Sequence, residues 1–253
     1  MLCFFTPLWT IGQGFTENQG QWRGPFHHKL DLQGGTAFLE NDGITFHLTD
    51  RSGIFGPHGS HDPLADNIEH HHVFKFKFLG CNKSAGVHGK SVYGHYNNFY
   101  LGSDPSRWKT KIFPTHELIY EDLYDGIDLR LNEYGDHLKY EFIVDPTSDY
   151  RDIRIRISHA DDIAFDRNGN LIISTSVGDI FESKPVVFQE RNGKRWQVEA
   201  EFVLSMNTVS YSIPKYDTTL PLIIDPDLVF STFSGSTSDN WGFTASPDKF
   251  GNL

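Results

Sequence analysis

Histidine is the residue type that offers the most chemistry in this sequence. His70 and His72 are two positions apart, so on a β-strand their side chains would share one face, as in metal sites built on sheets. His58, His61 and Asp62 precede them and could complete the coordination shell of Zn²⁺. Because this spacing matches no recognised ligand set, we favour a surface His-rich loop that leads into a strand, and we predict no cofactor. Adventitious zinc, or calcium bound among the many Asp, stays open.

A second group of residues could bind carbohydrate. Tyr93, Tyr96 and Trp108 lie close together in the sequence, with Phe99 and Tyr100 between them, and could form an aromatic platform for sugar rings. Aromatic side chains dominate core burial in most proteins, so we favour the interpretation that most of them pack the core or fix the loop from 87 to 104.

Carboxylates are numerous, but none has a catalytic spacing. Pairs such as Glu117 and Glu121 can always be drawn from 33 acidic residues, and only their separation in space would identify a glycosidase. The segment Asp166-Arg167-Asn168-Gly169-Asn170 resembles a calcium loop superficially, but its Gly is misplaced and the closing Glu is missing, which favours a hairpin turn. No nucleophile elbow, HExxH, GxGxxG or P-loop motif occurs. We therefore predict no catalytic residue and no enzyme.

Charge and composition exclude several partners. The 253 residues include 22 Lys and Arg against 33 Asp and Glu, which gives a net charge of −11. Such a balance argues against a nucleic-acid partner and against adsorption to an anionic membrane. With 38% hydrophobic residues, 21 Phe and 10 Tyr, the chain can form a packed core.

The N-terminus suggests export. Residues 1–14 contain an apolar run from Leu2 to Ile11, which is about the length of a signal-peptide core and too short to span a bilayer. Gly12 and Gly14 would put small residues before a cleavage site, although no basic residue precedes the run. We predict a truncated signal peptide over 1–14, no membrane span, and a secreted or cell-surface location. Removal of this leader would leave Cys81 without an internal disulfide partner.

Strand and turn patterns dominate the rest of the chain. Four pairs of apolar runs flank turns at Asp42-Gly43, Gly135, Asn168-Gly169 and Asn192-Gly193, which is typical of β-hairpins. Residues 73–78 and 153–157 alternate apolar with basic side chains, as expected for half-buried antiparallel strands. Residues 114–124 could form two helical turns, but the surrounding β pattern favours a strand. We predict an all-β, antiparallel, sandwich-like fold over residues 15–227. This region could consist of two subdomains, about 15–110 and 111–227.

The tail from 228 to 253 differs in character, because it is rich in Ser, Thr, Gly and Asp. Its segment Asp248-Lys249-Phe250-Gly251-Asn252-Leu253 repeats the pattern of residues 166–171, and it stops where the next strand should begin. We therefore expect the sequence to be the N-terminal part of a longer chain.

An ordered series of motifs resembles a known family. The series consists of Phe15-Thr16-Glu17-Asn18-Gln19-Gly20-Gln21, Tyr96 to Pro105 with Trp108, Leu123 to Leu129, Leu138 to Pro146, Phe188-Gln189 and Pro221 to Pro226. It is similar to the N-terminal domain of unknown function that precedes SBBP (seven-bladed β-propeller) repeats in secreted, gliding-motility-associated or adhesin-like bacterial surface proteins. Residues 228–253 then resemble the first propeller repeat. Thr147-Ser148 and the His-rich segments depart from the family pattern, and the family supplies no catalytic residues to transfer.

The resemblance implies a non-enzymatic extracellular adaptor module of a large cell-surface repeat protein that functions in adhesion or gliding. Its partners would be the downstream propeller repeats of the same chain, and surface glycans or cell-envelope proteins. Two alternatives stay open: a secreted carbohydrate-active or metal-dependent hydrolase, and a glycan-binding module. A pocket with two suitably spaced carboxylates would favour the hydrolase.

Overall fold

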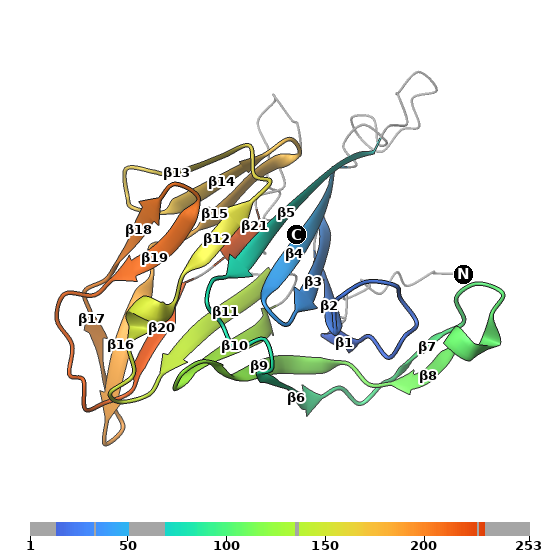
Figure 1. The fold of residues 1–253 in the computed structure, drawn as a ribbon, viewed down its shortest axis with the longest axis horizontal. Coiled ribbons are helices and arrows are strands. Elements are labelled where there is room, and N and C mark those ends of the chain that lie inside the picture. The colour runs from blue at the N-terminus through green and yellow to red at the C-terminus, as the bar shows by residue number, and fades with distance from the viewer. Residues whose placement is uncertain (1–13, 33, 51–68, 135–136, 227, 231–253) are drawn as a thin grey trace, which may run out of the picture.

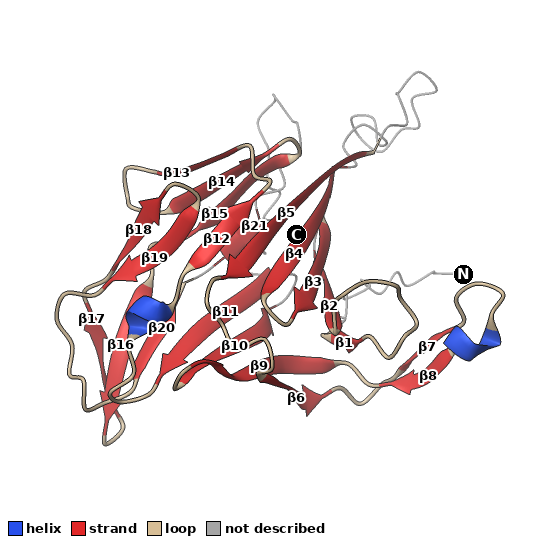
Figure 2. Cartoon of the chain, viewed as in Figure 1, coloured by secondary structure: helices blue, strands red, loops and turns tan. Residues whose placement is uncertain are grey.

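The computed structural model describes residues 14–32, 34–50, 69–134, 137–226 and 228–230, and over these ranges it is all-β and antiparallel (Figures 1 and 2). The prediction of an antiparallel all-β protein is confirmed. The described helical turns are two short 3-10 helices, η2 (Pro105–Arg107) and η3 (Tyr150–Asp152).

The larger sheet has eight strands. In spatial order they are β1 (Thr16–Glu17), β2 (His28–Leu32), β3 (Gly35–Glu40), β4 (Gly43–Asp50), β5 (His70–Phe78), β12 (Ile155–Ser158), β19 (Thr208–Ser212) and β18 (Glu201–Ser205).

The second sheet has seven strands. Their order is β17 (Lys194–Val198), β16 (Val186–Arg191), β20 (Leu222–Asp225), β11 (His137–Val144), β10 (Ile127–Tyr134), β9 (Thr115–Tyr124) and β6 (Gly86–Val92). Both large sheets contain strands from either side of residue 110, so the chain crosses between them repeatedly.

Two smaller sheets complete the described fold. One consists of β13 (Asp162–Phe165), β14 (Leu171–Thr175), β15 (Gly178–Glu182) and β21 (Leu228–Phe230). The other is the hairpin of β7 (Asn97–Phe99) and β8 (Lys109–Ile112), which extends from the body of the molecule in Figure 1.

All four predicted hairpins form. The turn of the first hairpin lies at Asn41-Asp42 and joins β3 to β4. Gly43 begins β4 and pairs with Glu40, and a Cβ at this position would lie 2.2 Å from the carbonyl oxygen of Phe76. β10 pairs with β11 up to Tyr134↔His137, and the turns at 168–169 and 192–193 join β13 to β14 and β16 to β17. Residues 115–124 form strand β9, as favoured from the sequence.

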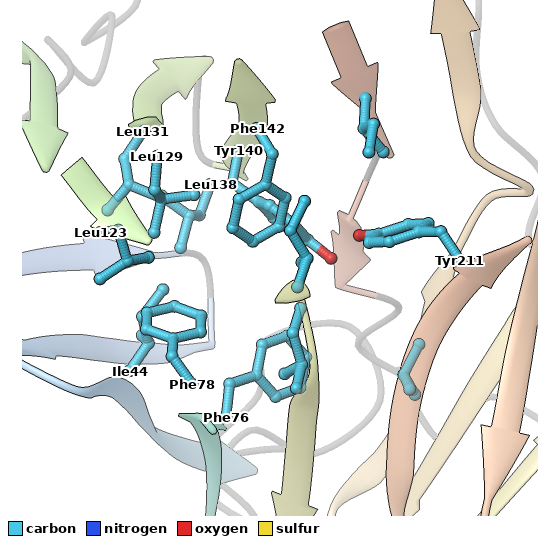
Figure 3. Packing of buried hydrophobic residues seen from close by; sticks show 14 of the residues in the cluster. Ile44, Phe76, Phe78, Leu123, Leu129, Leu131, Leu138, Tyr140, Phe142 and Tyr211 are labelled. Carbon is cyan, nitrogen blue, oxygen red and sulfur yellow. The ribbon is translucent and has the colours of Figure 1, made fainter. Parts of the chain in front are cut away.

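Twofold alternation decides which side chains enter the core. On β5, Phe74, Phe76 and Phe78 are buried, whereas Lys75 lies on the opposite face and pairs with Glu40 at 2.6 Å. Ile153, Ile155 and Ile157 are buried in the same way. The apolar faces of the large sheets contribute to one continuous core, part of which is drawn in Figure 3.

Candidate functional site

Of the five predicted metal ligands, the structure describes His70 and His72. His58, His61 and Asp62 lie outside the described residues. His70 is exposed at the start of β5, and His72 is engaged by the turn between β14 and β15. Ser176 N donates to His72 Nδ1 at 3.2 Å, and His72 Nε2 lies 2.6 Å from the carbonyl oxygen of His159. Both ring nitrogens of His72 therefore have protein partners. The ring joins β5 to the four-stranded sheet that contains β14 and β15.

Two other histidine pairs form across or along the larger sheet. His47 stacks on His71, with Nε2 and Nδ1 3.1 Å apart, and His27 Nδ1 lies 2.8 Å from His28 Nδ1. Burial lowers the pKa of His28 to about 4, and neighbouring His27 contributes to the same effect. Within the described ranges, no three His, Cys, Asp or Glu side chains converge as metal ligands would.

The three predicted ligand-binding aromatics lie in separate contacts. Tyr93 donates to Glu133 Oε2 at 2.7 Å, and its ring lies over His116. Burial, with Glu133 alongside, raises the pKa of the Tyr93 hydroxyl. Tyr96 packs against Phe113.

Trp108, the third of these aromatics, packs against Tyr100 in the β7–β8 hairpin. Its indole Nε1 donates to the carbonyl oxygen of Gly102 at 3.2 Å. Tyr96 and Trp108 remain 48% and 41% exposed, so the structure leaves part of each ring open to solvent.

A different group of aromatic and basic side chains surrounds a hollow of about 430 Å³ on the β2–β3 side of the larger sheet. We call it the Trp22 groove. Its lining residues come from the segment before β2, from β2 and β3, and from the β7–β8 hairpin: Gln21, Trp22, Arg23, Phe26, Lys29, Thr36, Phe38, Leu101 and Arg107.

Gln21 fixes the wall of the Trp22 groove. It is fully buried; its Oε1 accepts from Gln19 N at 2.7 Å, and its Nε2 donates to the carbonyl oxygen of Glu17 at 2.6 Å. Arg107 Nη2 donates to the carbonyl oxygen of Gln21 at 3.1 Å. This bond joins residues 86 positions apart and attaches the β7–β8 hairpin to the segment before β2.

Aromatic contacts hold the rest of the groove in place. The rings of Trp22 and Phe99 meet edge to face with centroids 4.8 Å apart, and those of Phe26 and Phe38 do so at 4.9 Å. Lys29 Nζ lies 4.8 Å from the centre of the Trp22 ring, which is a cation–π geometry. Lys29 also pairs with Asp31 at 2.7 Å, so its position is fixed from two sides.

Arg23 differs from the other two cations of the Trp22 groove. It is exposed, and across the residues that the structure describes its guanidinium makes no hydrogen bond or ion pair. Five N–H donors are thus available for a ligand.

Sequence reasoning missed the Trp22 groove because its parts are distant in the chain. Residues 15–21 and the segment from Tyr96 to Trp108 stood out as separate motifs, but neither indicates that it contacts the other. A usable clue was the density of aromatic and basic residues from Trp22 to Lys29.

A second hollow, of about 300 Å³, lies beside the end of β5. Its lining includes Cys81, Tyr124, Asp125, Asp152 and Arg154. Burial raises the pKa of the Cys81 thiol, so the thiol is a poor nucleophile at neutral pH. The two carboxylates with the arginine are the feature of this hollow that a hydrolase could use.

A buried acid lies where three sheets meet. Glu182 on β15 is 1% exposed and accepts a short hydrogen bond from the Tyr140 hydroxyl on β11. Tyr211 on β19 points its hydroxyl toward Tyr140 (Figure 3). Burial raises the pKa of Glu182 to about 7, although the bond from Tyr140 acts in the opposite direction. We call these three side chains the three-sheet junction.

Strand β21 reaches the three-sheet junction from the C-terminal side. Its residues pair with β15 in the register Leu228↔Glu182, Val229↔Phe181 and Phe230↔Ile180. The backbone that follows residue 227 is therefore hydrogen-bonded directly beside the buried acid.

Comparison with known proteins gives one match. No curated protein and no solved structure matches the chain. Within the described residues, no helix is long and apolar enough to cross a membrane. Residues 15–227 match the family described as a domain of unknown function, DUF7948. The match spans most of the sequence and nearly all of the described strands, so the chain belongs to the DUF7948 family.

Proposed function

We propose that this domain is a non-enzymatic, extracellular adaptor module, and that it holds the segment that follows it in a fixed position at the cell surface. The observation that carries the proposal is strand β21. Residues 228–230 lie beyond the matched domain, yet they add a fourth strand to the sheet of β13, β14 and β15. A following segment that begins inside the sheet is oriented by this domain, unlike one attached through a flexible linker.

The proposal gives each large element a role. The two large sheets act as a sandwich-like scaffold. The sheet of β13, β14 and β15 offers an edge at β15 that the next segment covers. The resemblance of residues 228–253 to a first SBBP-type propeller repeat supports a propeller as that segment, and adhesion or gliding as the setting.

The strand addition can be tested by thermal denaturation of three chains with the same start that end at residues 227, 230 and 253. We expect the chains ending at 230 and 253 to share one Tm. The chain ending at 227 should unfold a few degrees lower, because each ladder hydrogen bond lost costs about 1 kcal/mol. Equal Tm values for the chains ending at 227 and 230 would overturn the adaptor proposal.

Location needs its own experiment. A tag near the C-terminus of the full chain should be accessible to antibody and to protease on intact cells. Retention of the tagged chain inside the cells would refute the extracellular part of the proposal.

A hydrolase is the second candidate, and the hollow beside Cys81 is the observation that favours it. If this hollow were catalytic, the chain would release reducing ends from a polysaccharide panel, and Asp125→Asn and Asp152→Asn would each abolish the release. We expect no release from wild-type protein. Release that depends on both aspartates would replace the adaptor proposal.

A further inference from the structure

The Trp22 groove has a ligand chemistry that the adaptor function does not use. We propose that it binds an acidic saccharide, in which sugar rings carry carboxylate or sulfate groups. The inference stands independently of strand β21, because the groove is lined by β2, β3 and the segments beside them and by the β7–β8 hairpin, none of which belongs to the sheet that contains β21.

Charge is the first argument. The chain as a whole carries a net charge of −11, yet the lining of the Trp22 groove contains Arg23, Lys29 and Arg107 and no acidic residue. Lys29 is partly neutralised by Asp31, and Arg107 spends one N–H group on Gln21. Arg23 keeps its full charge and its donors, and a guanidinium forms paired hydrogen bonds with carboxylate and sulfate oxygens.

Shape and apolar surface are the second argument. A small inorganic anion would need only the cations, whereas this hollow is also lined by Trp22, Phe26 and Phe38. Rigid aromatic rings give a large apolar contact at low entropic cost, which suits the flat apolar faces of sugar rings. A volume of about 430 Å³ lies in the range typical of small-ligand sites, and the hollow opens to solvent, so a longer chain could continue past it.

Preorganisation is the third argument. The ring of Trp22 is fixed by Phe99 and Lys29, and Phe38 is fixed by Phe26. The Gln21 hydrogen bonds lock the backbone immediately before Trp22. A site whose side chains are already in place loses little conformational entropy on binding.

The test is a titration of the full chain, followed by its tryptophan fluorescence, with four probes of similar length. These are oligogalacturonate, a heparin-derived oligosaccharide, neutral maltohexaose and a single-stranded oligonucleotide. We expect at least one acidic oligosaccharide to bind about tenfold or more tightly than maltohexaose and the oligonucleotide. Oligogalacturonate carries carboxylates only and the heparin probe carries both groups, so equal binding of the two shows that carboxylates suffice, and tighter binding of the heparin probe shows that sulfates contribute.

Matched variants localise the binding. Arg23→Glu should weaken binding of the acidic probe about tenfold or more, since it turns a free guanidinium into a repelling carboxylate. Arg167→Glu makes the same change of charge in the exposed β13–β14 turn, outside the groove, and should stay within about twofold of wild type. Phe38→Leu keeps an apolar side chain but removes the ring, and should weaken binding while the circular dichroism spectrum is retained.

Three results would overturn the proposal. They are absence of binding to both acidic probes, equal binding to maltohexaose or to the oligonucleotide, and equal loss in the Arg23→Glu and Arg167→Glu variants. None of them bears on the Tm comparison of the truncated chains, so the two proposals fail separately.

Discussion

Replacing Glu182 with Gln should change how the stability of this domain depends on pH. The pKa of Glu182 rises from 4.5 to about 7 in the folded state, because the carboxylate is buried at the three-sheet junction. An unfolded chain ionises this group from about pH 4.5 upward, whereas the folded chain keeps its proton until about pH 7. The unfolded state is therefore favoured as pH rises through this window, and stability is lost between about pH 4.5 and 7.

The size of the effect follows from the two pKa values. Each pKa unit corresponds to about 1.4 kcal/mol, so the wild-type protein should lose about 3 kcal/mol of unfolding free energy across the window through this group alone. Glu182→Gln cannot ionise. The unfolding free energy of the variant, relative to that of wild type, should therefore rise by about 3 kcal/mol between pH 4.5 and pH 8. A cost of the amide that does not depend on pH shifts both ends of this range equally and leaves the rise unchanged.

Urea unfolding followed by tryptophan fluorescence, at half-unit steps from pH 4.5 to pH 8, measures this difference. The contributions of the other titrating groups cancel in the difference between the two unfolding free energies, because both proteins contain these groups. Glu199→Gln, a substitution of an exposed glutamate, is the matched control and should run parallel to wild type. If Glu182→Gln also runs parallel to wild type over the whole range, the carboxylate is not held protonated and the reasoning fails.

Three other perturbations test separate parts of the fold. His28 has its pKa lowered to about 4 by burial, so its contribution to stability is full above pH 6.5 and falls by about 3 kcal/mol as pH drops to 4; His28→Asn cannot take up this proton and should lack that loss, and an acid limb in urea unfolding that runs parallel to wild type would contradict it. Gly14→Ala should cost at least about 1 kcal/mol in urea unfolding, because Gly14 has a φ of +65° and a Cβ would lie 2.7 Å from the Tyr93 ring; a neutral result would show that this segment is not held as described. Phe142→Ala should cost about 3–5 kcal/mol, since this ring contacts rings from both large sheets, whereas a cost near 1 kcal/mol would mean that the core collapses around the gap.

Local structure could be predicted because it depends on short-range rules. The turn at Asn192-Gly193 follows from its sequence, since Asn192 (φ +55°) and Gly193 (φ +76°) both lie in the left-handed region that Asn and Gly tolerate. The burial of Phe74, Phe76 and Phe78 follows from twofold alternation along an extended strand. Such features need no knowledge of distant parts of the chain.

The arrangement of sheets could not be predicted in the same way. β5 pairs with β12, and β12 with β19, so strands around residues 75, 155 and 209 are neighbours in space. The entropy cost of closing a loop grows only slowly with its length. Many pairings between distant hairpins therefore have similar closure costs, and the sequence pattern does not distinguish them.

The same contrast between local patterns and distant contacts applies to the candidate sites. Residue types and near neighbours are enough to predict the alternating strands, the hairpins, the acidic net charge and the family motifs. The contact of Arg107 with Gln21, and the meeting of Glu182, Tyr140 and Tyr211 from three sheets, become visible only once the chain is folded. Ligand grooves and shifted pKa values arise from burial and from contacts between distant segments, and no local pattern encodes either of them.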